Sequence, residues 1–317
     1  MTDPGSAPPE VLGLARERAA ARAGERYAEA DRLRDRIAEA GWSVVDEPGG
    51  FRLEPIAAPE PEPGGRVAAA EVEDVLDEPT THDASVHWVC EGWPQDIERA
   101  VAAFRRHAGA RALHLVVADV TGEDPGRWGD DVEVVPLSEG TGWAAARNAG
   151  LKRSRGRLVL ALDGSIEPTG DVIAPLDSAL GDRAVGIAGP YGVVTTDLRE
   201  FEPSPDPGPC DAIEGYLMAF RREVLREAGP FDEKFRWYRT ADIEWSFRVK
   251  DLGYRCEVVP VPVHKHEHRM WFETPPEERA RWSKRNFYRF LDRWRDRWDL
   301  VLSGEPDHPH HHDHGSG

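Results

Sequence analysis

The sequence is poor in cysteine and lacks long apolar segments. It has 3 cysteines in 317 residues, at Cys90, Cys210 and Cys256, and none forms a CxxC pair. This spacing excludes a zinc knuckle and a disulfide framework, and it predicts a reducing compartment such as the cytosol. The first residues show neither the basic nor the apolar segment of a signal peptide. Since no window holds about 18 uninterrupted apolar residues, we expect no transmembrane helix.

Basic residues are also scarce relative to acidic ones. The chain has 40 Lys and Arg against 58 Asp and Glu, a net charge of −18. This balance argues against nucleic-acid binding by the whole chain, because phosphate contacts need a basic surface. It leaves a bound divalent cation open, since carboxylates are the usual ligands of hard cations. The hydrophobic fraction is 40% with 11 Trp, enough to form the core of one large domain beside a small accessory piece.

The N-terminal part predicts a small accessory domain over residues 1–54. Residues 11–40 are rich in Ala, Arg and Glu, and the interruption at Gly24 predicts two helices joined by a turn. The segments 42–45 and 51–53 flank Pro48-Gly49-Gly50 and predict a β-hairpin. Residues 55–83 have few large apolar side chains and are predicted to be a disordered linker. Residues 304–317 are a His-rich tail, to which we attach no function.

Strands and helices alternate over residues 84–303. The apolar segments predict strands at 85–90, 113–117, 132–136 and 157–162, with helices at 95–108, 141–153 and 276–299. Such alternation is typical of an α/β domain with a mostly parallel sheet and helices on both faces. Ligands of these sheets bind beyond the carboxyl ends of the strands.

Polar side chains stand at two of those strand ends. Asp119 follows one strand, and Asp163-Gly164-Ser165 follows the most apolar one. Arg147 and Asn148 lie on a helix of small residues that can pack close to the sheet. These residues suit contacts with a nucleotide, although a turn-capping Asp and ordinary helix packing explain each motif taken alone.

Histidines recur at His264, His266 and His268. On an extended segment this spacing places all three side chains on one side. Imidazole is a common metal ligand, so the cluster indicates either a metal site or a structural role.

The order and spacing of these blocks resemble family 2 glycosyltransferases of the GT-A fold. The resemblance covers about 220 residues and includes Asp119, GWAAARNAGL, LALDGS, EGYLMAFRREVLREAGPFDEKF, ADIEWSFRVKDLGYR and the histidines after VVPVPV. It implies a hexosyltransferase-like enzyme that moves a sugar from a nucleotide-diphospho-sugar to the hydroxyl of a saccharide or a lipid-linked acceptor, with inversion.

The resemblance also assigns the donor side of the site. Asp119 would contact the base, and Arg147, Asp163 and Ser165 would bind the rest of the donor. Asp163 would hold Mn²⁺ or Mg²⁺. Ser165 stands where the family has its main metal ligand, so the predicted metal ligands are Asp163 with His264 and His266, and Glu167 is a further candidate.

On the acceptor side, the resemblance makes Asp242 the catalytic base, which takes the proton of the attacking hydroxyl. Glu214, Gly215, Glu244 and Trp245 are expected beside the acceptor, with a salt bridge as the alternative role of Glu244. Arg248 is expected to hold the helix that carries these acceptor-side carboxylates. Ala241 replaces the acid that usually precedes the base. The losses at Ala241 and Ser165 leave open a degenerate domain that binds sugar nucleotides or glycans without turnover.

Two further segments keep alternatives open. The stretch RERAAARAGERYAEADRLRDRIAEAGWSVVDEPGGFRL resembles the C-terminal tail of cysteinyl-tRNA synthetase, which implies tRNA or protein docking by residues 1–54. The helix predicted at 276–299 is basic and aromatic. It suits either packing of its Trp residues on the core or peripheral contact of a cytoplasmic protein with a membrane.

Overall fold

A computed structural model of the chain describes residues 7–24, 26–47, 50–55 and 65–304. The chain divides into two compact units, Met1–Glu62 and Pro63–Gly317. The predicted His-rich tail, apart from Gly304, lies outside the described residues, as do residues 56–64 of the predicted linker.

The first unit contains a helical hairpin and a β-hairpin, as predicted. Its elements are α1 (Pro9–Ala23), α2 (Tyr27–Glu39), β1 (Trp42–Glu47) and β2 (Gly50–Pro55), and the two strands pair antiparallel. Val11, Ile37 and Val44 form a small core where helices meet strands. The guanidinium of Arg18 donates to both carboxylate oxygens of Asp46, at 2.7 and 3.0 Å, and ties α1 to β1.

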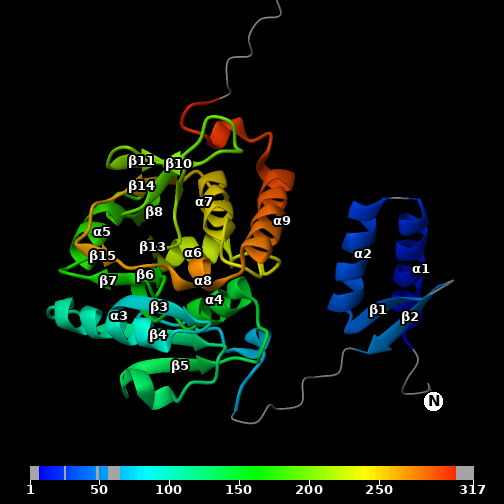
Figure 1. The fold of residues 1–317 in the computed structure, drawn as a ribbon, viewed down its shortest axis with the longest axis horizontal. Coiled ribbons are helices and arrows are strands. Elements are labelled where there is room, and N and C mark those ends of the chain that lie inside the picture. Colours follow the sequence, from blue (N-terminus) through cyan, green and yellow to red (C-terminus); the bar gives the residue numbers. More distant parts are fainter. Residues whose placement is uncertain (1–6, 25, 48–49, 56–64, 305–317) are drawn as a thin grey trace, which may run out of the picture. The chain divides into compact units, whose positions relative to one another are not determined.

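The second unit is built on an eight-stranded sheet (Figure 1) with the order β11-β14-β8-β13-β6-β3-β4-β5. The strands are β3 (His82–Cys90), β4 (Leu113–Asp119), β5 (Val132–Pro136), β6 (Gly156–Leu162), β8 (Val185–Gly189), β11 (Gly208–Cys210), β13 (Leu217–Arg221) and β14 (Arg255–Val258). Only β13 and β11 run against their neighbours. The prediction of a mostly parallel sheet is therefore confirmed.

Helices cover both faces of this sheet, because the side chains of each strand alternate between two cores. One core includes α3 (Pro94–His107) and α5 (Ile173–Leu180), which pack on Val86, Leu160 and their neighbours. The other includes α4 (Trp143–Lys152), α6 (Arg222–Ala228) and α7 (Ala241–Asp251), which pack on Val159, Phe220 and their neighbours.

Smaller elements surround this core. Short antiparallel pairings join β7 (Ile166–Pro168) to β15 (Val263–Lys265), and β9 (Gly192–Val194) to both β10 (Glu202–Pro203) and β12 (Ala212–Ile213). The remaining elements are α8 (Arg269–Glu273), α9 (Pro276–Trp294), η1 (Ala69–Glu71), η2 (Pro125–Trp128) and η3 (Trp298–Leu300).

The long C-terminal helix α9 packs by its apolar side against the domain. Phe290 and Trp294 are buried with Phe247 of α7, and the rings of Phe247 and Phe290 meet edge to face at 5.1 Å. Tyr288 remains 55% exposed on the other side. The helix ends at Trp294, earlier than predicted, and η3 follows. Among the residues that the structure describes, no helix is long and apolar enough to cross a bilayer.

Residues 65–83 do not form the predicted linker. Val72 and Val75 are buried against the rest of the second unit, and the Val75 N–H donates to the Lys152 carbonyl at 2.9 Å. Val67 forms a parallel bridge with Leu137 at the edge of the sheet. Composition alone predicted a linker because these isolated valines are spaced among polar residues, and only the adjoining core supplies the surface that buries them.

Replacing Phe290 with Ala tests how far α9 contributes to the core. We expect Phe290→Ala to cost about 3–5 kcal/mol of unfolding free energy, since a large buried ring leaves a cavity. The exposed control, Tyr288→Ala, should change it by less than about 0.5 kcal/mol. Urea unfolding followed by Trp fluorescence measures both changes. Trp42 is the one Trp before residue 63, so the fluorescence reports mainly on the second unit. Equal losses in the two variants would contradict this packing.

Candidate functional site

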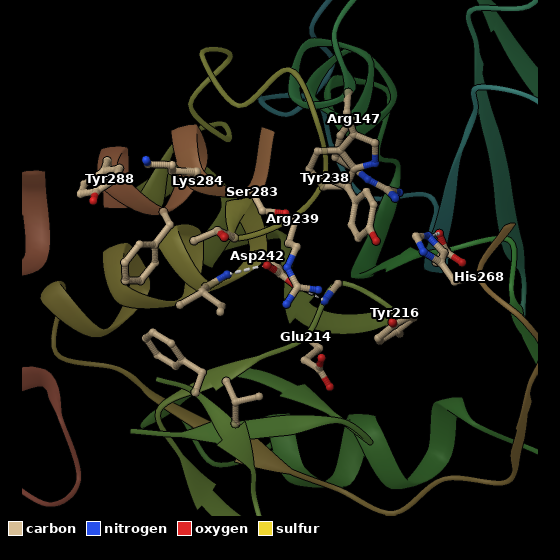
Figure 2. A pocket seen from close by; sticks show the side chains of 18 of the residues that line it. Arg147, Glu214, Tyr216, Tyr238, Arg239, Asp242, His268, Ser283, Lys284 and Tyr288 are labelled. Atoms are coloured by element: carbon tan, nitrogen blue, oxygen red, sulfur yellow. Dashed lines mark hydrogen bonds and ion pairs between the residues drawn. The ribbon is translucent and has the colours of Figure 1, made fainter. Parts of the chain in front are cut away.

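A cavity of about 580 Å³ opens in the second unit, where β6, α4, α7 and α9 approach one another. Figure 2 shows side chains from these elements and from the loops between them around one space. The lining includes three carboxylates, several aromatic rings and several basic side chains. Its residues include Trp143, Arg147, Asp163, Arg199, Glu214, Gly215, Tyr216, Tyr238, Arg239, Thr240, Asp242, His268, Ser283, Lys284, Phe287 and Tyr288.

Asp163 reaches this cavity because β6 ends directly before it. Its Oδ2 lies 2.9 Å from Nε2 of His268, and its Oδ1 accepts from the Ser165 N–H at 2.8 Å. Burial by itself would raise the pKa of Asp163, but the contacts with His268 and Ser165 together outweigh it, and the pKa lies below the ordinary value. Asp163 is therefore held as a carboxylate at the carboxyl end of the sheet.

The expected metal set of Asp163, His264 and His266 does not assemble. His264 lies on β15 with its ring near that of His266, while His266 contacts Glu167 at 2.7 Å. Because β15 ends at Lys265, the third histidine leaves that alternation, and His268 meets Asp163 instead. Among the described residues, no three His, Cys, Asp or Glu side chains gather as a metal site.

Ser165 lies beside this pair. Its side chain is buried, and its hydroxyl has no hydrogen-bond partner among the described residues. With Asp163 and His268, it lines a smaller hollow that adjoins the main cavity. Asp163, His268 and Ser165 thus bring one carboxylate, one imidazole and one unpartnered hydroxyl oxygen together.

Arg147 is buried in the cavity wall. Its guanidinium donates to the carbonyls of His87 and Leu162 at 2.9 and 2.8 Å, and so ties β3 to β6 directly before Asp163. Burial lowers the pKa of Arg147 to about 10, and Asp163 opposes that shift. Asn148 was predicted to suit a nucleotide contact, but its side chain binds the protein backbone instead. It exchanges two hydrogen bonds with the Phe231 backbone, and so holds the loop after α6.

Asp119 ends β4 and is saturated by its own loop. Its two oxygens accept from the backbone N–H groups of Thr121, Gly122 and Glu123 and from the Thr121 hydroxyl, over 2.6–3.0 Å. The residue is 1% exposed and does not line the cavity. The turn-capping alternative therefore describes Asp119 in this structure better than a contact with a nucleotide base does.

Asp242 is the second residue of α7 and points into the cavity (Figure 2). Its Oδ2 accepts from the Gly215 N–H at 2.7 Å, and its Oδ1 accepts from the Ile243 N–H at 2.9 Å. Burial raises the pKa of Asp242, although these N–H groups favour the charged form. The preceding residues turn sharply, since Thr240 has a φ of 71°.

The acceptor-side set divides in two. Glu214 and Gly215 line the cavity with Asp242, and the pKa of Glu214 is raised by burial and then by the Asp242 charge. Trp245 and Glu244 do not line it, which corrects their expected position. Trp245 is fully buried and stacks on Phe231. Glu244 binds Arg248 and Arg293 at 2.7 and 3.1 Å, so it has the salt-bridge role given as its alternative.

Several lining residues were not selected from the sequence. The rings of Tyr216 and Tyr238 both meet the imidazole of His268 edge-on. Arg239 precedes Asp242 by three residues, and Lys284 comes from α9. Tyr216 lies inside the motif EGYLMAFRREVLREAGPFDEKF, but its sequence position gave no signal that its ring meets a histidine more than 50 residues away.

The Asp163–His268 contact makes a prediction about protonation. In His268→Ala the buried carboxylate loses its imidazole partner, so burial prevails and the pKa of Asp163 should rise. The wild-type pKa is lowered, so its contribution to stability is present above the unfolded pKa and is lost as the pH falls. Carboxyl-carbon NMR titration measures the change, with His264→Ala as the control. An unchanged Asp163 titration in His268→Ala would refute this electrostatic role.

Known proteins resemble parts of this chain in sequence and in fold. Residues 118–243 match the family model described as Glycosyl transferase family 2, and this span contains Asp163, Glu214 and Asp242. A crystal structure of GalNAc-T7 with UDP, GalNAc and Mn²⁺ shares the fold, with a TM-score of 0.53 and 19% identity. The match covers 69% of this chain and 48% of that chain.

Two other similarities are weaker or shorter. The mannosyltransferase PcManGT from Pyrobaculum calidifontis, in complex with GDP-Man and Mn²⁺, aligns at a TM-score of 0.49 and 20% identity, over 89% of this chain and 76% of its own. A cysteine–tRNA ligase of Opitutus terrae is 50% identical over 48 residues, which is 15% of this chain and 10% of the ligase. The second unit therefore has the GT-A fold, and its residues 118–243 match glycosyl transferase family 2.

Proposed function

We propose that this protein transfers a sugar from a nucleotide-diphospho-sugar to an acceptor hydroxyl, with inversion at the anomeric carbon. One observation carries the proposal. A single cavity receives Asp163 from the end of β6 and Asp242 from the start of α7. The first position suits the donor diphosphate and the second suits the acceptor. The match of residues 118–243 to a glycosyl transferase family supports the same reaction class.

The donor would lie against the carboxyl ends of β6 and β3, where α/β sheets bind ligands. Arg147 lines the cavity and supports this floor through the carbonyls of His87 and Leu162. Arg239 and Lys284 line the same cavity and are exposed. Their charges would offset the negative charge that grows on the departing diphosphate.

Asp242 is the proposed base. As the acceptor oxygen attacks the anomeric carbon, its proton passes to Asp242, and the bond to the diphosphate breaks with its electron pair on the leaving group. The position at the start of α7 favours the carboxylate through the helix dipole, while burial makes it a stronger base. The Gly215 N–H fixes the orientation of this carboxylate.

A divalent cation fits the donor side only with help from the substrate. Asp163 and His268 would hold it, with the buried Ser165 hydroxyl beside them. Ions such as Mg²⁺ use one or two protein carboxylates together with substrate phosphates, so two protein ligands are compatible with such a site. When bound, the cation would neutralise charge on the diphosphate.

A degenerate domain that binds sugar nucleotides or glycans without turnover is the second candidate. Ala241 and Ser165 favour it, because each stands where the family has an acid. Docking of tRNA by residues 1–54 stays a prediction, as does a lipid-linked acceptor reached by peripheral membrane contact.

A panel of UDP-, GDP- and dTDP-sugars tests the enzyme against the degenerate domain. We expect release of nucleoside diphosphate from at least one donor, and a fall of about 100-fold or more in Asp242→Asn, which cannot accept the proton. The matched control is Asp292→Asn, an exposed carboxylate on α9. Donor binding by calorimetry without turnover would favour the degenerate domain, and undiminished turnover in Asp242→Asn would exclude it as the base.

The cation proposal predicts a dependence on both ligands. Calorimetric titration of UDP should show tighter binding with Mn²⁺ than with EDTA, because the cation joins the diphosphate to Asp163 and His268. We expect this gain to disappear in Asp163→Asn and in His268→Ala, and to persist in His264→Ala. A gain that survives both site variants would place the cation elsewhere.

A further inference from the structure

A second cavity, of about 450 Å³, lies at the other end of β6 from Asp163. Arg157 is the second residue of β6, and Arg221 ends β13 opposite Leu158. The proposed donor site lies instead beyond Leu162, which pairs with Leu217 at the start of β13. The length of the sheet therefore separates the two cavities. The second is lined by five arginines, namely Arg157, Arg183, Arg221, Arg222 and Arg226.

Arg222 is the residue that ordinary packing does not explain. It is 5% exposed, and one of its terminal nitrogens donates to the Val75 carbonyl. Among the described residues it forms no ion pair, and its Nε has no hydrogen-bond partner. Burial lowers the pKa of Arg222, and the charge of Arg226 lowers it further, while the charge of Glu78 opposes both effects. Since buried charges are normally paired, a buried cation without an ion pair is an unusual feature of this cavity wall.

None of the described acids that line the cavity forms an ion pair with Arg222: Glu78, whose charge opposes the lowering of the Arg222 pKa, pairs with Arg155. Arg226 pairs with Asp77 and Arg183 with Glu223, and all four side chains are at least 45% exposed. Exposed pairs of this kind contribute little, so a ligand can replace the Asp77 carboxylate at low cost, whereas Glu223 also binds the buried Arg221 at 2.8 Å. Arg221 is different. It donates to the carbonyls of Leu180, Val185 and neighbouring residues, and so forms a fixed part of the wall.

We propose that this cavity binds a phosphate-type oxyanion, either inorganic phosphate or the phosphate group of a small monoester. Guanidinium groups offer paired N–H donors that match the oxygens of such an anion. The volume lies in the range of small-ligand sites, so the cavity has room for a sugar attached to the phosphate. Arg222 and Arg226 bind the anion, which gives the buried Arg222 a directly bonded negative partner. This site is independent of the proposed transferase reaction.

Thermal unfolding of the full chain in a concentration series of ligand tests the proposal, because a ligand that binds the folded state raises the unfolding midpoint. The ligands are inorganic phosphate, sulfate and ribose 5-phosphate, with chloride at matched ionic strength as the reference. We expect phosphate to raise the midpoint above chloride. A larger rise with ribose 5-phosphate at equal concentration identifies a monoester site, and an equal rise identifies a site for the oxyanion alone.

Variants locate the anion. Arg226→Gln, at an exposed position, should weaken the apparent affinity about tenfold, or about 1.4 kcal/mol. Arg222→Gln should weaken it further, and if that variant does not fold, Arg226→Gln and Arg157→Gln carry the test. The controls are Arg106→Gln, an exposed arginine of α3, and Arg239→Gln in the first cavity, and both should retain binding. No phosphate effect in the wild type overturns the proposal. So does a loss confined to Arg239→Gln, which would place the anion in the first cavity.

Discussion

The buried guanidinium of Arg147 holds together the part of the molecule on which the candidate site depends. It donates to carbonyls of β3 and β6, two adjacent central strands, directly before the chain reaches Asp163. A buried Arg without a directly bonded carboxylate is costly, and burial lowers its pKa to about 10. The two carbonyls and the nearby charge of Asp163 offset that cost. The position of Asp163 therefore follows from how the strand ends are joined.

Supporting contacts also position the groups on the other side of the cavity. Asp242 is oriented by the Gly215 N–H, which belongs to the chain between β12 and β13, so the proposed base is tied to the sheet that carries Asp163. Asn148 on α4 fixes the loop at Phe231, whose ring stacks on the buried Trp245 of α7. Trp245 is thus a packing residue that positions the helix of Asp242. Such supporting contacts place donor-side and acceptor-side groups around one space.

Charge is distributed unevenly over this acidic chain. The net charge is −18, yet five arginines line the second cavity, and the Nε of the buried Arg222 has no hydrogen-bond partner among the described residues. The segment 65–83 contributes to this arrangement, since the Val75 carbonyl accepts from Arg222 and Asp77 pairs with Arg226. A stretch whose composition predicts a linker thereby forms one wall of a cavity.

The sequence by itself determined the class of the fold, because strand and helix periodicity depends on local spacing and the order of the blocks limits the topology. It also predicted that Asp163 directly follows a strand, which the structure shows, whereas the start of α7 just before Asp242 was not predicted. Only the tertiary structure decided which candidates share a cavity. The carboxylate of Asp119 accepts hydrogen bonds from its own turn, and Trp245 is buried in the core. His268 contacts Asp163 because β15 ends before it. Such outcomes depend on contacts between residues far apart in the chain, and local spacing carries no information about them.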